Sequence, residues 1–461
     1  MSDCHKPSTA AYWLRLAFAA LAIRLAVAFL LFGGLPQVSD ALSYANQARR
    51  MVEGTQSQAA YYWPPGRSYC LTPFFLLFGT SETVIKANSV LFDIGCVLLI
   101  ALLAHRLLRQ QSAARIAGWI AAFYPPAVLL SPWSFAQNVA QFFLLASACV
   151  AIGAMQRPWK GNLTQLARWL VAGAFLGFAI LTRPSVTSVL LVVVGGLCFA
   201  IAQRVRSRRT QAATPWLKSI GGVASFAFGA FLCVLPVAYR HASLGAGWCV
   251  STNNELNFFL GNNRYTPNYK TWHWGQHHPS GPGEAEVAAY FSRVTQGPQR
   301  RQRMLHEGLH YIAERPDVFL LRTVNRIRAY WGFDYLTASD LDAPAWIRAA
   351  CLAIEAGGYI LTMLLVIAGV FLHARGMEAK NAVLLIALVA ALQLPYALSF
   401  ACGRYHFPDM GFLIPFAGLA IDVLRRKEAG RWHVRWYWTS VAIFLAIQVE
   451  YAWQIYSWHT G

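Results

Sequence analysis

The sequence predicts an all-α polytopic membrane protein, a bundle of about eleven transmembrane helices with a mixed extracytoplasmic loop unit. Three observations favour this fold class. Of the 461 residues, 56% are hydrophobic and only 13% are charged, which is too little polar surface to cover a soluble core of this size. The apolar residues form runs of roughly 20, the length that crosses about 30 Å of hydrocarbon. The basic residues cluster in the loops between these runs.

The predicted spans follow one another along the chain, and tryptophan and tyrosine mark their ends as in interfacial belts. Leu71–Phe78 is too short to span and is expected to be a helix on the membrane surface. The first run is long and contains Arg15 and Arg24, so we expect it to stay as an anchor. The expected spans are Tyr12–Phe32, Val84–Leu107, Arg115–Leu130, Asn138–Met155, Ala167–Leu181, Val186–Ile201, Ile220–Ala238, Ala349–Leu372, Ala382–Phe400, Phe407–Leu424 and Trp436–Tyr456.

Basic residues give the orientation, because short cytoplasmic loops concentrate Lys and Arg. With eleven spans, five basic loops lie on the same side as the N-terminus. The net charge of +19 is then mainly a topology signal, with some attraction for anionic lipid headgroups. Nucleic acid is not an expected partner, because the basic residues form no single patch. The loops are Arg106–Arg115, Arg157–Arg168, Arg204–Lys218, Arg375–Lys380 and Arg425–Arg435.

Two longer segments fall on the opposite face and divide the chain. We expect an N-terminal transmembrane region over residues 1–239, with an interfacial first loop at 33–83, then an extracytoplasmic unit at 240–346 and C-terminal helices at 347–461. The chemistry is expected on the extracytoplasmic face of a bacterial inner membrane. Of nine cysteines, only Cys70, Cys249 and Cys402 can meet an oxidising compartment, which allows one disulfide.

Asp40 is the best single candidate for chemistry. It follows the first span, begins an amphipathic pattern that ends at Gly54, and precedes the aromatic, proline-rich segment 62–66. An acid at a membrane surface is placed to act on a molecule that lives in the bilayer. The alternative is that Asp40 only caps its helix, and the two roles do not exclude each other.

Two arginines and a run of amides lie on the same predicted face. Arg183 and Arg404 interrupt hydrophobic spans there, and a guanidinium binds phosphate with two donors at once; the alternative is that each snorkels to the interface. Residues 251–263 place several asparagines among aromatic residues. That composition suits a sugar pocket and equally suits tight turns.

Taken in order along the chain, these segments resemble the family 39 glycosyltransferases of the GT-C class, which include protein O-mannosyltransferases and the aminoarabinose transferases of lipid A. The resemblance runs to about Ala420 and depends on the order of the motifs rather than on any one of them. The motifs are the acidic first loop with Asp40, Trp63-Pro64-Pro65-Gly66, Tyr124-Pro125-Pro126, Leu181-Thr182-Arg183-Pro184, Pro236 to Arg240, Ser251-Thr252-Asn253 to Asn263, and Arg404-Tyr405 to Pro408.

This resemblance implies an enzyme that passes a sugar from a polyprenyl-phosphate donor to the hydroxyl of a glycan, lipid or protein acceptor. Asp40 matches the first-loop acid and would be the general base. Cationic or metal stabilisation of the departing lipid phosphate is expected, from Arg404 and Arg183 first. A divalent metal is the one cofactor allowed, with no ligands assigned. The expected substrate-binding residues are Tyr44, Tyr62, Arg67, Gln137, Arg183, Arg240, Asn257, Asn262, Arg404, Tyr405 and His406.

The sequence departs from the family pattern at two positions. Ala41 follows Asp40 where glutamate is common, and the position of a second acid falls on Gln137 or Asn138. Metal independence, an altered donor or acceptor, and loss of activity all stay open. Glu255 and Glu82 are acids that can substitute only if the fold brings them close.

Two other classes of function remain as alternatives. A transporter or flippase of lipid-linked saccharides would also be basic and polytopic, but would place ionisable groups at mid-bilayer. A non-catalytic binding subunit is the other alternative.

Overall fold

The computed structural model describes residues 9–56, 60–156, 163–193, 195–196, 199, 214–268, 284–297, 299–428 and 434–460. Every regular element in these ranges is a helix, and the β-bridge between Leu108 and Met377 is isolated. In the described part of the extracytoplasmic unit, which was expected to be mixed, every regular element is a helix. Much of two predicted basic loops, including Arg157, Lys160 and residues 204–209, lies outside the described residues, as does Arg431.

The helices follow the predicted order of apolar runs. Their bounds are α1 Thr9–Leu25, η1 Ala26–Leu31, α2 Ser39–Val52, α3 Gly66–Phe78, α4 Glu82–Leu107, α5 Gln111–Phe123, α6 Pro125–Leu130, α7 Ala136–Met155, α8 Leu163–Thr182, η2 Pro184–Ser188, α10 Thr214–Ser243, α11 Asn254–Gly261, α12 Glu284–Thr295, α13 Arg300–Glu314, α14 Pro316–Tyr330, α15 Leu336–Ser339, α16 Ala345–Phe371, η4 His373–Arg375, α17 Ala379–Leu398, η5 Gly403–His406, α18 Phe407–Arg425 and α19 Val434–Thr460.

Nine helices in the described part of the chain are long and apolar enough to cross a membrane. They coincide with nine of the eleven predicted spans, so the polytopic membrane fold is confirmed but the count of eleven is not. In place of the predicted span at Val186–Ile201, the described residues contain only a short apolar helix, Pro184–Val193. The predicted last span forms α19, which is not among the nine.

Helix α18 is the centre of the bundle. It packs against α5, α7, α16 and α17, and almost all of its residues are buried. The contact with α16 is close, because a Cβ added at Gly369 would lie 1.9 Å from the carbonyl oxygen of Phe416. Small residues at such crossings let helix backbones approach in a membrane, where van der Waals packing replaces the hydrophobic effect between helices.

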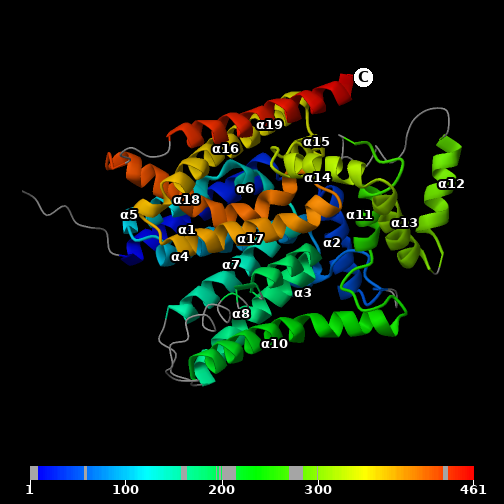
Figure 1. The fold of residues 1–461 in the computed structure, drawn as a ribbon, viewed down its shortest axis with the longest axis horizontal. Helices are drawn as coiled ribbons and strands as arrows, with labels where there is room; N and C mark the ends of the chain where they lie inside the picture. The colour runs from blue at the N-terminus through cyan, green and yellow to red at the C-terminus, as the bar shows by residue number, and fades with distance from the viewer. Residues whose placement is uncertain are drawn as a thin grey trace, which may run out of the picture.

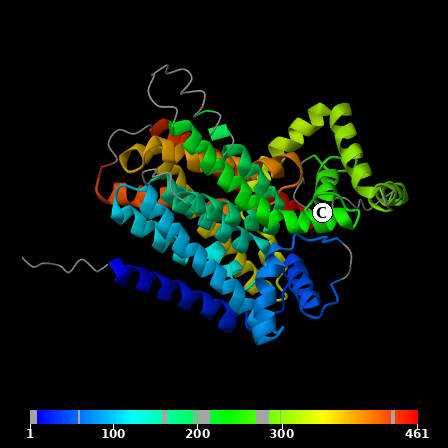
Figure 2. The same ribbon diagram turned by 90° about the horizontal axis from the view of Figure 1, so that it is seen from below.

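Helices α2 and α11–α13, which do not span, gather at one end of the bundle, called the loop end below. Figures 1 and 2 both show α2 and α11–α13 at this end, although they are far apart in the sequence. In Figure 2, α1 lies along the edge of the bundle. Cys70, Cys249 and Cys402 are all free thiols, so the disulfide that the sequence allows is not formed in this structure.

A buried ion pair joins α1 to α4 inside the apolar part of the bundle. Arg24 donates to the carboxylate of Asp93, and its Nη1 also donates to the carbonyl oxygen of Ala122 in α5 at 2.8 Å. Both side chains are almost fully buried. Removal of one partner from such a pair leaves an uncompensated charge, which costs more than removal of both.

We therefore expect Asp93→Leu to destabilise the protein by about 3–5 kcal/mol, because Arg24 stays buried without its counter-ion. The double variant Arg24→Leu/Asp93→Leu should recover most of that loss. Denaturant titrations of the detergent-solubilised protein measure both changes. A double variant no more stable than Asp93→Leu alone would contradict this account.

Candidate active site

A cavity of about 420 Å³ lies at the loop end and is walled by segments that are distant in the sequence. The start of α2, the turn at Trp63 and Pro64, the start of α7, the α8–η2 junction, α11 and the end of α17 all contribute to it. Charged, amide and aromatic side chains share its surface, as expected of a site for a polar ligand. Those used below are Asp40, Tyr44, Trp63, Gln137, Arg183, Asn253, Asn254, Asn257, Phe258, Tyr396 and Tyr405.

Asp40 stands in the first turn of α2. The residue before it, Ser39, has a φ of 49°, in the left-handed region that non-glycine residues seldom occupy. Backbone strain of this kind clusters at functional sites, where the surrounding structure holds it. The entry of the chain into α2 is therefore fixed by more than helix capping alone.

Two buried side chains hold the loop that leads to Asp40. The ammonium of Lys86 in α4 donates to the carbonyl oxygens of Phe32, Gly33 and Leu35, at 2.5, 3.0 and 2.8 Å. Gln37 binds the backbone that precedes α7: its Oε1 accepts from the N–H of Ser134 at 2.6 Å and its Nε2 donates to the carbonyl oxygen of Pro132 at 3.3 Å. These bonds tie the Asp40 loop to the segment that positions Gln137.

The Asp40 carboxylate faces opposing electrostatic effects. Burial raises its pKa above the ordinary aspartate value, the positive charges of Arg404 and Arg183 lower it, and Asp340 raises it. Burial dominates, so the pKa lies above that of a solvated aspartate. When it is ionised, a carboxylate with a raised pKa is a better proton acceptor than an ordinary aspartate.

Arg183 is the cation in the cavity wall. Pro184 disfavours a helical conformation at the preceding residue, and Arg183 is accordingly extended between α8 and η2. Its Nε donates to the Tyr396 hydroxyl at 3.0 Å, and its guanidinium lies 4.8 Å from the ring centre of Tyr405. No carboxylate among the described residues pairs with it. Arg183 can therefore bind an anionic group of a ligand.

The turn at Trp63-Pro64-Pro65-Gly66 packs on the end of α8. A Cβ at Gly66 would lie 2.5 Å from the backbone nitrogen of Thr182, so only glycine allows this approach. The contact brings Trp63 to the cavity, with its ring centre 5.8 Å from that of Tyr44. Aromatic faces beside the asparagines of α11 form a surface suited to a sugar.

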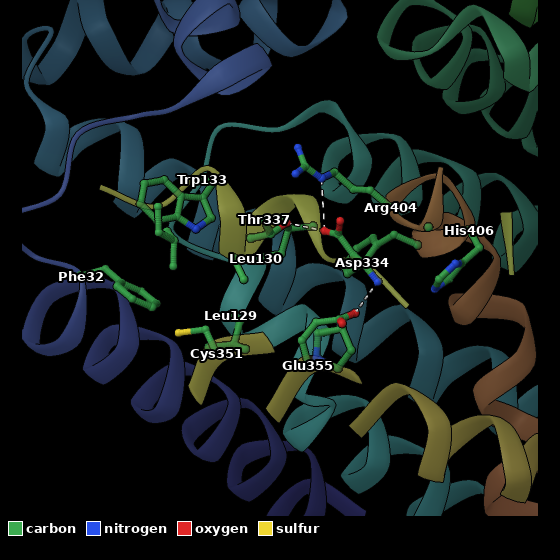
Figure 3. Close-up of a pocket in the computed structure, with 15 residues that line it drawn as sticks. Phe32, Leu129, Leu130, Trp133, Asp334, Thr337, Cys351, Glu355, Arg404 and His406 are labelled. Carbon is green, nitrogen blue, oxygen red and sulfur yellow. Dashed lines mark hydrogen bonds and ion pairs between the residues drawn. The ribbon is translucent and has the colours of Figure 1, made fainter. Parts of the chain in front are cut away.

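Arg404 lies behind this cavity rather than in its wall. It lines a smaller cavity of about 20 Å³, shown in Figure 3, together with Asp334 and Glu355. Its Nε donates to Asp334 at 3.2 Å, its Nη2 lies 3.4 Å from an oxygen of Asp340, and its guanidinium stacks over Phe135. Two carboxylates thus hold Arg404 in place, and it acts on Asp40 through its charge.

The structure brings five more of the predicted residues to the wall beside Asp40, namely Tyr44, Gln137, Asn257, Tyr405 and Arg183. It places the others outside the wall. Arg67 is fully buried against Ser89 and the carbonyl of Ser134, and Arg240 stacks on Tyr61. Asn262 donates to the carbonyls of Phe258 and Leu398, His406 stacks on Tyr359, and Tyr62 is 41% exposed.

Sequence reasoning missed Tyr396 and the acids that hold Arg404. The Tyr396 hydroxyl contacts both Arg183 and Ser185, the latter at 2.7 Å. Its signal in the sequence is a tyrosine after Pro395 in the last turn of an apolar run. Asp334 and Asp340 had no signal of their own, because nothing local distinguishes them from ordinary loop acids.

The side chains of the cavity do not match a divalent-metal site. Asp40 is the one carboxylate in its wall, and the described part of the chain has no group of three or more His, Cys, Asp or Glu residues placed to hold a metal ion. Mg²⁺ and Ca²⁺ bind sets of oxygen ligands. The two substitute acids are engaged elsewhere, Glu82 with Arg49 and Glu255 with Arg301.

Comparison with known proteins shows that the chain has a known architecture. The family model of dolichyl-phosphate-mannose-protein mannosyltransferases matches residues 63–237. The oligosaccharyltransferase AglB from Archaeoglobus fulgidus, solved with an inhibitory peptide and a dolichol-phosphate, superposes with a TM-score of 0.53 at 14% identity. That alignment covers 90% of this chain and 50% of AglB. The chain has the GT-C fold. The sequence resemblance to this class is thereby confirmed.

Other structures with the GT-C fold are also similar. An oligosaccharyltransferase from Archaeoglobus fulgidus tethered to an acceptor peptide gives a TM-score of 0.50 at 14% identity, again over 90% of this chain and 50% of that one. ArnT from Cupriavidus metallidurans, bound to undecaprenyl phosphate, gives 0.44 at 12% identity over 90% and 78%. No curated protein matches the chain. The chain spans about half the length of AglB, so the likeness is one of fold.

The contacts of Gln37 predict a local effect on the acid-bearing loop. Gln37→Leu leaves the N–H of Ser134 without its acceptor and should cost about 1–3 kcal/mol of stability. Hydrogen exchange of residues 33–40 and 131–136 should quicken together, because Gln37 joins the two segments. Gln110→Leu, in the turn between α4 and α5, should leave exchange at both segments unchanged. Faster exchange in only one of the two segments would show that Gln37 does not couple them.

Proposed function

We propose that this protein is a glycosyltransferase that moves a sugar from a polyprenyl-phosphate donor to the hydroxyl of an extracytoplasmic acceptor, with Asp40 as general base. The acceptor is a glycan, a lipid or a protein. The GT-C fold supports the class of reaction, and the family match and the dolichol-phosphate held by AglB support a lipid-phosphate donor. The observation that carries the proposal is one cavity that contains Asp40, Arg183 and the amides of α11.

The proposed chemistry is a single displacement. The acceptor oxygen forms a bond to the anomeric carbon while the bond from that carbon to the phosphate oxygen breaks. Asp40 takes the acceptor proton, and the bonding electrons leave with the lipid phosphate. Arg183 stabilises the charge that develops on this phosphate, since it has no carboxylate partner among the described residues and its position is fixed by Tyr396.

The other groups of the cavity bind and orient the sugar in this proposal. Trp63 and Tyr44 offer aromatic faces, and Asn253, Asn254 and Asn257 offer both donors and acceptors. Arg404 lowers the pKa of Asp40 through its charge and has no contact with the donor in this proposal. The distribution of basic loops supports a site on the extracytoplasmic side of the membrane, which we propose to be a bacterial inner membrane.

A transporter has less support. The ionisable pair inside the apolar region, Arg24 with Asp93, is closed on itself and lines a cavity of only about 10 Å³. A transport path needs polar groups that a substrate can reach at mid-bilayer. The experiment that separates the classes gives purified protein a panel of labelled polyprenyl-phosphate sugars. Sugar transfer to acceptor or water supports the enzyme, passage across a liposome supports a flippase, and binding alone supports a non-catalytic subunit.

Asp40→Asn should abolish transfer, with a loss of at least roughly 10²–10⁴-fold, because the amide cannot accept the acceptor proton. Folding and the affinity for polyprenyl phosphate should be retained. Asp342→Asn, which neutralises an exposed acid, is the matched control and should turn over normally. Initial rates in proteoliposomes measure the effect, and undiminished turnover by Asp40→Asn removes this residue from the mechanism.

The raised pKa of Asp40 also predicts a pH dependence. The base must be ionised, so the rate should fall as pH drops through a pKa that lies above the ordinary aspartate value. Asp340 raises the pKa of Asp40 through its negative charge. Asp340→Asn should therefore move the acidic limb of the rate profile to lower pH. A limb that stays in place, or moves to higher pH, contradicts the assignment of that limb to Asp40.

A further inference from the structure

The first turn of α7 opens into the same cavity as Asp40. Ala136 and Gln137, the first two residues of this 20-residue helix, both line the wall, and no side chain caps the helix. The first N–H groups of a helix have no partner within it. Those of Ala136 and Gln137 have no acceptor among the described residues, whereas the neighbouring N–H groups of Ser134 and Val139 are bound by Gln37 and Asn138.

Gln137 adds a second, independent observation. Its side chain is only 4% exposed, faces the cavity, and makes no hydrogen bond within the described part of the chain. A buried amide normally has partners, because an unsatisfied donor costs about 1–3 kcal/mol. Its two N–H donors are thus available for a ligand, next to the positive end of the α7 dipole.

The ligand that fits these donors is an anion. Helix N-termini bind phosphate through backbone N–H groups and the dipole, and Arg183 supplies a full positive charge to the same cavity. A carboxylate at position 137 would oppose this, because it would bring a second negative charge beside Asp40. The amide removes that charge and offers donors instead.

We propose that the first turn of α7 and the Gln137 side chain form a phosphate subsite. Together with Arg183, this subsite binds the phosphoryl group directly, both in the lipid donor and in the released lipid phosphate. The inference rests on the proposed function and names the part of the site that receives the leaving group. In the family pattern an acid belongs at Gln137 or Asn138, and this chain has amides at both positions. Donors placed where charge develops lower the barrier to departure.

The test measures phosphate binding rather than turnover. Purified protein in nanodiscs is titrated with polyprenyl monophosphate and, separately, with inorganic phosphate, for the wild type, Gln137→Ala and Gln137→Glu. Gln137→Glu should weaken binding of the lipid phosphate roughly ten- to a hundredfold, since it exchanges donors for a repelling charge. Gln137→Ala should weaken it less, because it removes donors only. Gln302→Glu, the same change at an exposed position of α13, should bind as the wild type does.

The two probes identify the source of the phosphate. If inorganic phosphate also binds in a manner that depends on Gln137, the subsite recognises the phosphate group alone; if only the lipid phosphate does so, the isoprenoid tail is needed for occupancy. Equal affinity of Gln137→Glu and wild type for both probes overturns the inference. If these equal affinities come with normal sugar transfer, the subsite is refuted and the proposed function is not. If phosphate binding depends on Gln137 but the protein transfers no sugar, the proposed function is refuted and the subsite is not.

Discussion

The attachment of the acid-bearing loop to the bundle is the constraint on which the site depends. Lys86 gathers three carbonyl oxygens at the end of the first span, and Gln37 spans to the backbone before α7. A loop of this length at a membrane surface would otherwise sample many positions, and the carboxylate of Asp40 would have no fixed distance to any partner. Lys86 belongs to the spanning helix α4, Gln37 binds the backbone next to α7, and both side chains are buried. The loop is therefore held as rigidly as these helices, and Asp40 and Gln137 share one wall.

The two arginines that interrupt the spans have different roles because their partners differ. Arg404 is neutralised locally by Asp334 and Asp340, so its influence on the cavity is a fixed background potential. Arg183 is held by a hydroxyl and by aromatic faces, which orient a guanidinium without consuming its charge. The neutral partners of Arg183 keep its charge available to an incoming anion, whereas the acids around Arg404 make it part of the scaffold.

The fold was predictable because runs of apolar residues and the placement of basic loops are properties of single segments. The meeting of Asp40, Arg183, Asn257 and Tyr405 was also within reach, since topology alone puts their segments on one face. Partners that are distant in the sequence decide whether an arginine side chain points into the cavity. Arg67, next to the turn at Gly66, donates to Ser89 in α4. Arg404 pairs with an acid some 70 residues away in the sequence. Hydropathy also does not register helix type, so it could not indicate that the segment after Arg183 begins as the 3-10 helix η2.

The pair between Arg24 and Asp93 sets an order on biosynthesis. The arginine is made 69 residues before its counter-ion, and a cation within a lone apolar helix costs about 2.5–3.5 kcal/mol on insertion. Helix α1 therefore carries this cost in the lipid until α4 is inserted and Asp93 neutralises Arg24. The apolar residues of the first span offset this cost during synthesis, and the pair with Asp93 removes it once α4 packs against α1.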